Sequence, residues 1–268
     1  MSAVPQVARQ FRFTNKAFWR NPASAFFTFA FPLMFLVIFT SLLGDEELQL
    51  QGVELSTTTY YVGAMAAFGV ISACFTNIAI STTFNRDAGI LKRLRGTPIP
   101  VGAYLTSRVL HAMVVGAILV VITLLFGKIV YDSPLPTGGP LLEFIVSFVV
   151  GALSFAALAL ALTAAVPNAD AAPPVVNAVV LPLLFLSGIF FPLDDGAPTW
   201  MKTVADIFPV KHFADAMRAG FLGNLTAPTP VGTVRAFPFD WWDIAIIAAW
   251  GLLGLVLATR VFSWEPRR

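Results

Sequence analysis

The sequence predicts an all-α, polytopic membrane protein with six transmembrane helices, and three observations support this fold class. The chain has 268 residues, of which 57% are hydrophobic and only 12% are charged. Its mean hydropathy is +0.78, well above that of water-soluble domains. Its apolar residues also gather in long runs, and a bilayer core about 30 Å thick needs about 20 apolar residues per helix. We therefore expect a single transmembrane domain over residues 1–268.

Six apolar stretches are long enough to cross the bilayer. They cover residues 24–43, 60–82, 106–127, 141–166, 171–192 and 242–262. The first exceeds the apolar core of about 7–15 residues found in a signal peptide, so we expect it to remain as a span. Only Pro167-Asn168-Ala169-Asp170 separates the fourth stretch from the fifth, which predicts an antiparallel hairpin of two helices.

The distribution of charge predicts the orientation of these spans. If both termini are cytoplasmic, twelve of the 17 Lys and Arg residues lie on the cytoplasmic side, as membrane proteins prefer. Four acidic residues crowd into the first external loop: Asp45, Glu46, Glu47 and Glu54. We expect a multi-pass protein of the plasma membrane, and its composition favours a bacterial inner membrane. A net charge of only +2 gives no reason to expect a nucleic acid partner.

The cytoplasmic segment 84–100, between the second and third spans, predicts one short helix from Asn85 to Arg95. Asn85 can cap its start, Asp87 suits the positive end of the helix dipole, and Gly96 with Pro98 stops it. Three basic residues suit its other end: Lys92, Arg93 and Arg95. Three apolar residues share one side: Ile90, Leu91 and Leu94. The helix is therefore amphipathic, and it either docks a partner or lies on anionic lipid.

The loop over residues 193–239 predicts two short amphipathic helices at the external membrane surface, before a linker rich in Pro, Gly and Thr. His212 lies in the second of these helices, and no other His or Cys accompanies it. We therefore expect a surface histidine and not a metal ligand. A row of small residues on the fourth span, Ala157, Ala161 and Ala165, predicts close helix packing.

The chain lacks motifs for chemistry of its own. No charge stands at the centre of a span, whereas ion-driven transporters carry such charges. Gly127-Lys128 lacks the earlier glycine and the following Ser or Thr of a phosphate-binding loop. The single Cys74 excludes an internal disulfide. We expect no cofactor in this chain and no enzyme activity, so energy for any active transport must come from another polypeptide.

Four features resemble the permease subunits of type-2 ATP-binding-cassette exporters, and together they extend over nearly the whole chain. Phe18-Trp19-Arg20-Asn21-Pro22, which runs into a span with Pro32, resembles the amphipathic connecting helix that covers residues 1–23 and the first span. The segment from Asn85 to Pro98 is similar to the family's coupling segment, E-R-E-x-G-T-L-E-x-L-x-x-T-P. Asn85 replaces the first Glu of that pattern, and Ile90 replaces its Thr.

The other two features lie at the end of the fifth span and beyond it. Leu181-Pro182, followed by Leu186-Ser187-Gly188-Ile189-Phe190-Phe191-Pro192-Leu193, resembles the family signature. Pro209, with Arg218-Ala219 and Gly223, resembles the P-x(n)-R-A-x-x-x-G pattern of the external helices.

The resemblance implies partners and site residues. Two permease chains would form a homodimer or heterodimer, and a separate ATPase subunit would bind ATP and Mg²⁺. The implied contacts with the ATPase are Asn85, Arg86, Asp87, Gly89, Leu91, Lys92, Leu94, Arg95, Thr97 and Pro98. The implied substrate pathway comprises Phe68, Ser72, Phe75, Thr76, Asn177, Leu181, Leu184 and Gly188. The implied outer gate is formed by Phe190, Phe191 and Pro192.

A pathway lined by phenylalanine, with a few hydroxyl and amide groups, suits a hydrophobic or amphiphilic cargo such as a drug, an antibiotic or a lipid-like compound. The expected function is outward transport of such a cargo through the bilayer. Two alternatives remain open at this point. The same fold can export a polysaccharide or another cell-envelope precursor, and a membrane assembly protein without transport activity would also lack catalytic residues.

Overall fold

The computed structural model describes residues 3–43, 47–50, 53–97, 99–193, 196–229 and 232–261. The fold is 78% helical with almost no sheet. Within the described residues, five helices are long and apolar enough to cross a membrane: 25–43, 57–87, 102–131, 138–162 and 241–260.

The elements follow one another as an antiparallel bundle with a short strand hairpin in each of two connections. The helices up to Tyr131 are α1 (Ala3–Trp19), α2 (Pro22–Leu43), α3 (Thr57–Ile71), the π-helix η1 (Ser72–Thr76), α4 (Asn77–Asp87), α5 (Ile90–Arg95) and α6 (Val101–Tyr131). The later helices are α7 (Gly138–Leu162), α8 (Ala172–Phe185), α9 (Thr199–Ile207), α10 (Pro209–Leu222) and α11 (Trp241–Val261). The strands are β1 (Glu47–Leu50), β2 (Val53–Ser56), β3 (Thr226–Thr229) and β4 (Gly232–Arg235).

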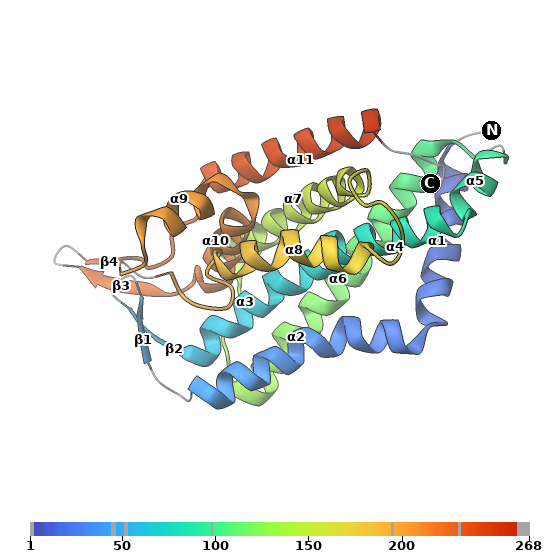
Figure 1. The fold of residues 1–268 in the computed structure, drawn as a ribbon. Helices are drawn as coiled ribbons and strands as arrows, with labels where there is room; N and C mark the ends of the chain where they lie inside the picture. The colour runs from blue at the N-terminus through green and yellow to red at the C-terminus, as the bar shows by residue number, and fades with distance from the viewer. Residues whose placement is uncertain are drawn as a thin grey trace.

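The two strand hairpins mark one end of the bundle, and α1 with α5 marks the other (Figure 1). The β1–β2 pair is antiparallel, with Glu47 opposite Ser56, and the β3–β4 pair is antiparallel, with Thr226 opposite Arg235. At the far end, α1 turns away from α2 and packs against α6, where the rings of Phe11 and Phe18 meet the edge of His111. The spans therefore run between a strand-rich end and a helical end.

The second span is the centre of the bundle. All 15 residues of α3 are buried, and the helix continues without a break through η1 and α4 to Asp87. It is therefore longer than the predicted stretch 60–82, and the predicted single helix from Asn85 to Arg95 is wrong. Asn85 lies in the last turn of α4 and not at a helix start. The chain reverses at Gly89, whose φ of 69° favours glycine, and α5 begins at Ile90.

The fifth predicted stretch, 171–192, is wrong in length. The α8 helix has 14 residues, and at 1.5 Å per residue it is about 21 Å long, shorter than the bilayer core. Its end follows from Ser187 and Gly188: the Ser187 hydroxyl donates to the carbonyl of Leu184, and Gly188 has a φ of 75°. The chain therefore leaves the helix and turns back, which buries Ile189 and Phe190 in the bundle.

The helices α9 and α10 form a re-entrant hairpin, so the prediction that both lie at the external surface is wrong for α10. The Phe213 ring of α10 is fully buried against Gly151, in the middle of α7. Phe208, at the vertex of the hairpin, stacks on Trp250 in the middle of α11, with 5.6 Å between ring centroids. The charged residues of α10 are thus brought inside the bundle, where they need polar partners.

The fourth and sixth predicted spans, α7 and α11, pack closely because α11 presents glycines to α7. A methyl group added to Gly251 would lie 2.3 Å from the Ser154 hydroxyl, and one added to Gly254 would lie 2.8 Å from the Leu158 nitrogen. Small residues that let two helix backbones approach are typical of membrane helix pairs. The α7–α11 pair forms the side of the bundle against which α10 of the re-entrant hairpin packs.

Candidate functional site

A pocket of about 480 Å³ opens between α2, the π-helical part of the second span and α8. Six of the eight residues predicted to line a substrate pathway line this pocket: Phe68, Ser72, Thr76, Asn177, Leu181 and Leu184. They come from two segments about 100 residues apart in the chain. The structure thus brings together the faces of the second and fifth predicted spans.

The π-helix η1 contributes two hydroxyl groups of the second span to this pocket. A π-helical turn holds one more residue than an α-helical turn, which changes the direction of the side chains that follow. Ser72 and Thr76, the first and last residues of η1, both line the pocket. π-Helical turns are frequent at functional sites. The pocket therefore combines apolar walls with hydroxyl and amide groups.

Phe75 and Gly188, the other two predicted pathway residues, lie elsewhere. Phe75 lines a second, apolar pocket on the other side of α8, because the π-helical turn directs it away from Ser72 and Thr76. Gly188 lies past the end of α8, in a polar cluster at the hairpin. Sequence reasoning also missed α2, which contributes Phe27, Thr28 and Phe31 to the first pocket. The α2 helix is apolar on all sides, so its sequence does not show which side faces the pocket.

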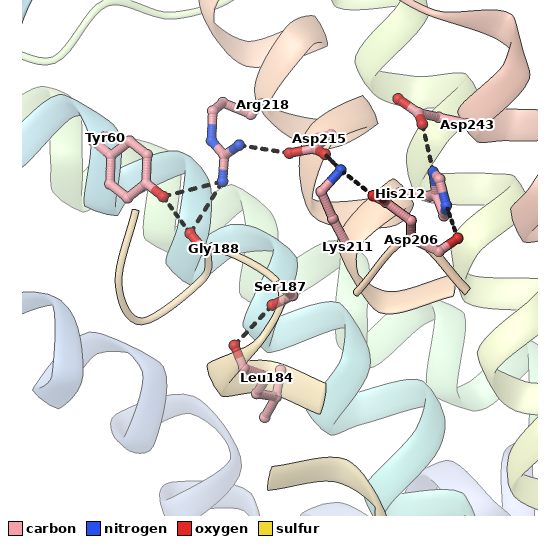
Figure 2. Close-up of polar contacts among 10 residues, drawn as sticks. All are labelled: Tyr60, Leu184, Ser187, Gly188, Asp206, Lys211, His212, Asp215, Arg218 and Asp243. Carbon is pink, nitrogen blue, oxygen red and sulfur yellow. Dashed lines mark hydrogen bonds and ion pairs between the residues drawn. The ribbon is translucent and has the colours of Figure 1, made fainter. Parts of the chain in front are cut away.

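A polar cluster, which we name the Arg218 latch, joins the segment after α8 to α3 and α10. Figure 2 shows the Arg218 guanidinium and the Tyr60 hydroxyl both donating to the carbonyl oxygen of Gly188, the former at 3.1 Å. Arg218 also donates to the Asp215 carboxylate at 2.7 Å, and its guanidinium lies 4.8 Å from the centre of the Tyr60 ring. The latch therefore fixes the backbone where the predicted signature turns.

The signature phenylalanines differ in exposure. Phe190 is buried among the rings of Phe35, Phe68 and Phe185, at centroid distances of 5.6, 5.5 and 5.0 Å. Its carbonyl accepts a hydrogen bond of 2.9 Å from the Tyr61 hydroxyl. Phe191 is exposed, and Pro192 is half-buried. Phe190 thus packs on the pocket residue Phe68, whereas Phe191 is exposed.

The polar cluster continues along the re-entrant hairpin. His212 is buried, with Nδ1 at 2.7 Å from the Asp243 carboxylate and Nε2 at 2.9 Å from the Asp206 carbonyl, so the prediction of a surface histidine is wrong. Lys211 lies between Asp206 and Asp215, at 2.9 and 3.2 Å. Lys211 and Arg218 thus pair with carboxylates of the hairpin itself, and His212 pairs with α11, which lets α10 enter an apolar bundle.

At the other end of the bundle, Arg86 joins the end of α4 to the turn between α7 and α8. Its guanidinium donates to the carbonyls of Thr163, Val166 and Pro167, at 2.7, 2.6 and 3.3 Å. Beside it, the Asp87 carboxylate accepts from the Ala169 N–H at 2.9 Å. These four bonds, which we name the Arg86 joint, tie the second span to the start of α8.

The Arg86 joint corrects part of the predicted ATPase contact. The side chains of Arg86 and Leu91 are 2% and 0% exposed, so they face this chain and not a partner. Asn85, Asp87, Gly89 and Leu94 are half-buried, and Lys92 and Thr97 are exposed. Arg95 ends α5, and Pro98 lies outside the described residues. Two apolar residues that the prediction did not include as contacts, Phe84 and Ile90, are 46% and 44% exposed on either side of the Gly89 turn.

The family model of the ABC-2 type transporters matches residues 6–222 of this chain. The match covers most of the sequence and includes the pocket, the Arg86 joint and the latch. The chain therefore belongs to the ABC-2 type transporter family, a family of transport permease components, and the resemblance inferred from the sequence is confirmed. Its long apolar helices and its family together make it a multi-pass membrane protein.

Individual relatives point the same way. A putative transport permease of Bacillus subtilis, YvfS, is 23% identical over 242 residues, which are 89% of each chain. A probable multidrug ABC transporter permease of Escherichia coli, YbhR, is 24% identical over 144 residues, 54% of this chain and 38% of the relative. Nodulation protein J of Rhizobium leguminosarum is 38% identical over 72 residues, 27% of each chain.

Proposed function

We propose that this chain is the permease subunit of an ATP-binding-cassette exporter that moves a hydrophobic or amphiphilic compound out of the cell, driven by a separate ATPase subunit. The observation that carries this proposal is the pocket between α2, η1 and α8. Its walls of phenylalanine and aliphatic side chains, with Ser72, Thr76 and Asn177 among them, match a cargo that is mostly apolar and has a few polar groups.

The pocket is open on the side formed by α2 and α8, and this favours a second permease copy as its other wall. Exposed phenylalanines stand along this side: Phe27, Phe31, Phe185 and Phe191. A second copy of these helices would cover them and enclose the cargo between two chains. Closed symmetric pairs are the commonest oligomers, and we propose a dimer of this chain or of this chain with a similar one.

The α4–α5 end is the proposed contact for the ATPase subunit. In the proposed orientation, with both termini in the cytoplasm, this end faces the cytoplasm and carries exposed Phe84, Ile90, Lys92, Arg93 and Thr97. An apolar centre with a basic rim is suited to docking in a groove of a partner protein. The Arg86 joint then connects this contact with α8, one wall of the pocket.

Docking is tested by co-purification of the chain with its ATPase subunit. Ile90→Asp and Phe84→Asp place a charge in the exposed apolar part of the contact, and we expect each to abolish the complex. Val234→Asp, an equally exposed apolar position on β4 at the opposite end, is the control and should retain it. Full complex formation by both α4–α5 variants would contradict the proposed contact.

The cargo class is tested by stimulated ATP hydrolysis of the reconstituted complex. We expect hydrophobic drugs to stimulate hydrolysis, and we expect Ser72→Phe, which fills the pocket, to remove this stimulation. Ala249→Phe, on an exposed part of α11 outside the pocket, is the control. Stimulation by lipid-linked glycans alone would support the polysaccharide alternative, and no stimulation or transport with any cargo would favour an assembly role.

A further inference from the structure

A second pocket, of about 330 Å³, lies on the opposite side of α8 from the first, and we name it the slot. Its walls come from the second span, α7, α8 and α11, and the vertex of the re-entrant hairpin closes one end. Its aliphatic and aromatic lining includes Ile71, Ala161, Val179, Val180, Trp250 and Leu257. Two of them, Ile71 and Val180, also line the first pocket. The slot and the proposed pathway therefore share a wall.

The slot offers no polar recognition. The one polar group among its lining side chains is the indole N–H of Trp250, and this group already donates to the Ile207 carbonyl at 2.9 Å. Apolar cavities of such composition do not hold water and instead bind apolar molecules. The lining of the slot therefore suits a hydrocarbon chain.

The slot fits within the thickness of one leaflet of a bilayer. On α11 its lining extends from Trp250, in the middle of the helix, to Leu257, near the end of the helix. Seven residues at 1.5 Å each give about 10 Å, against about 15 Å for half of a bilayer core. The long axis of the slot thus runs along the spans, as an acyl chain does.

A basic residue stands beyond the Leu257 end of the slot. Val179 of α8 and Leu257 of α11 line the slot and are exposed and apolar, so hydrocarbon of the bilayer can reach it. Arg260 is exposed three residues after Leu257, on the same side of α11, because residues three apart in a helix are neighbours. A cation at this height suits a lipid phosphate.

We propose that the slot binds one acyl chain of a membrane phospholipid, from the leaflet at the α4–α5 end, with the phosphate of that lipid at Arg260. The bound chain supports the vertex of the re-entrant hairpin at Phe208 and fills the space behind the wall of the first pocket. This proposal requires only that the chain spans a membrane. It does not depend on which cargo is transported.

The test uses Trp250 as a probe inside the slot. A variant that keeps Trp250 and replaces the other five tryptophans, Trp19, Trp200, Trp241, Trp242 and Trp264, with Phe isolates its fluorescence. This variant is loaded with phospholipid brominated near the middle of its acyl chains and is then washed with detergent to remove loosely bound lipid. We expect a persistent loss of Trp250 emission, because bromine quenches only a nearby indole. Unquenched emission after the wash would overturn the proposal.

Two further substitutions separate the slot from general lipid contact. Ala161→Phe fills the slot and should restore Trp250 emission, whereas Ala245→Phe, on an exposed part of α11 outside it, should leave the quenching unchanged. Native mass spectrometry should find one retained phospholipid in the parent chain and none in Ala161→Phe, and Arg260→Gln should lower retention. Equal quenching and retention in the parent and in Ala161→Phe would contradict the proposal.

The thermal stability of the same proteins gives an independent measurement. Removal of all lipid should lower the melting temperature of the parent chain, because the hairpin loses its support. The shift should be smaller in Ala161→Phe, whose own ring occupies the slot. An equal shift in both proteins would mean that lipid acts elsewhere and would count against the slot.

Discussion

Both ends of α8 are held by an arginine from another helix, but the two arginines have different partners. At the α4–α5 end, Arg86 donates to three backbone carbonyls of the α7–α8 turn. At the strand-rich end, Arg218 combines a carboxylate, a hydroxyl and one carbonyl. The same side chain thus serves a joint made with the backbone at one end and a latch made mostly with side chains at the other.

The difference shows which end of α8 can move independently. Release of Arg86 would leave a buried cation and several carbonyls without their bonds, which is costly. Release of Arg218 from Gly188 would leave the guanidinium paired with Asp215, which Lys211 also neutralises. The first end of α8 should therefore follow the α4–α5 segment as a rigid unit, whereas its second end can separate from the hairpin.

The largest effect is expected for Arg86→Leu. Loss of the three Arg86 bonds leaves buried carbonyls unpaired and should lower the free energy of unfolding by about 3 kcal/mol. Thermal unfolding of the purified chain measures this change. Arg93→Leu, at an exposed position on α5, is the control and should change stability little. Equal stability of the two variants would show that Arg86 does not hold α8.

A smaller loss is expected for Arg218→Leu. The Asp215 carboxylate keeps Lys211, so the cost should be about 2 kcal/mol, less than that of Arg86→Leu. The same unfolding measurement gives the ranking of the two variants. A greater loss for Arg218→Leu than for Arg86→Leu would reverse the comparison between the ends of α8.

The backbone of the latch is tested by Gly188→Ala. A side chain at a φ of 75° costs about 1–2 kcal/mol, and the added methyl group would lie 3.3 Å from the Arg218 guanidinium. We expect a lower melting temperature, because the turn at position 188 is then strained. Gly102→Ala, where an added methyl group meets nothing within 4 Å, is the control. An unchanged melting temperature for Gly188→Ala would mean that the turn tolerates other conformations.

The smallest effect is expected for Tyr60→Phe, which removes one hydroxyl from the latch and leaves the Arg218 bond to Gly188. The expected cost is about 1 kcal/mol. If the latch opens during transport, this variant should also raise the basal rate of ATP hydrolysis in the complex. Tyr61→Phe, which removes the neighbouring bond to Phe190, tests whether the effect is specific to Gly188. Identical hydrolysis rates in both variants and the parent would exclude a role for Tyr60 in opening.

The sequence predicted the helical membrane class because that class depends on local patterns, whereas most residues of the first pocket were named through the family resemblance. Apolar runs gave the spans. The family resemblance assigned Phe68, Ser72 and Thr76 to the same face of the pathway as Asn177 and Leu181, and these five residues line one pocket. Periodicity failed where the helix geometry changes. The π-helix η1 turned Phe75 into the slot, and the left-handed conformation at Gly188 ended α8 early.

The two arginines could not be assigned from local patterns. Arg86 stands in a basic amphipathic segment, and such residues are usually exposed, but its partners lie about 80 residues further along the chain. Arg218 matched a family pattern, yet only the fold brings it to Tyr60 and Gly188, 158 and 30 residues away. Long-range polar contacts of this kind leave no periodic trace in one sequence.

The most direct test of the account is ATP-dependent uptake of a fluorescent hydrophobic compound by sealed inverted vesicles that contain this chain with or without its ATPase subunit. The account predicts uptake only when both are present, and loss of uptake when Ile90→Asp prevents their contact. Uptake of equal rate by vesicles that contain this chain alone would contradict it.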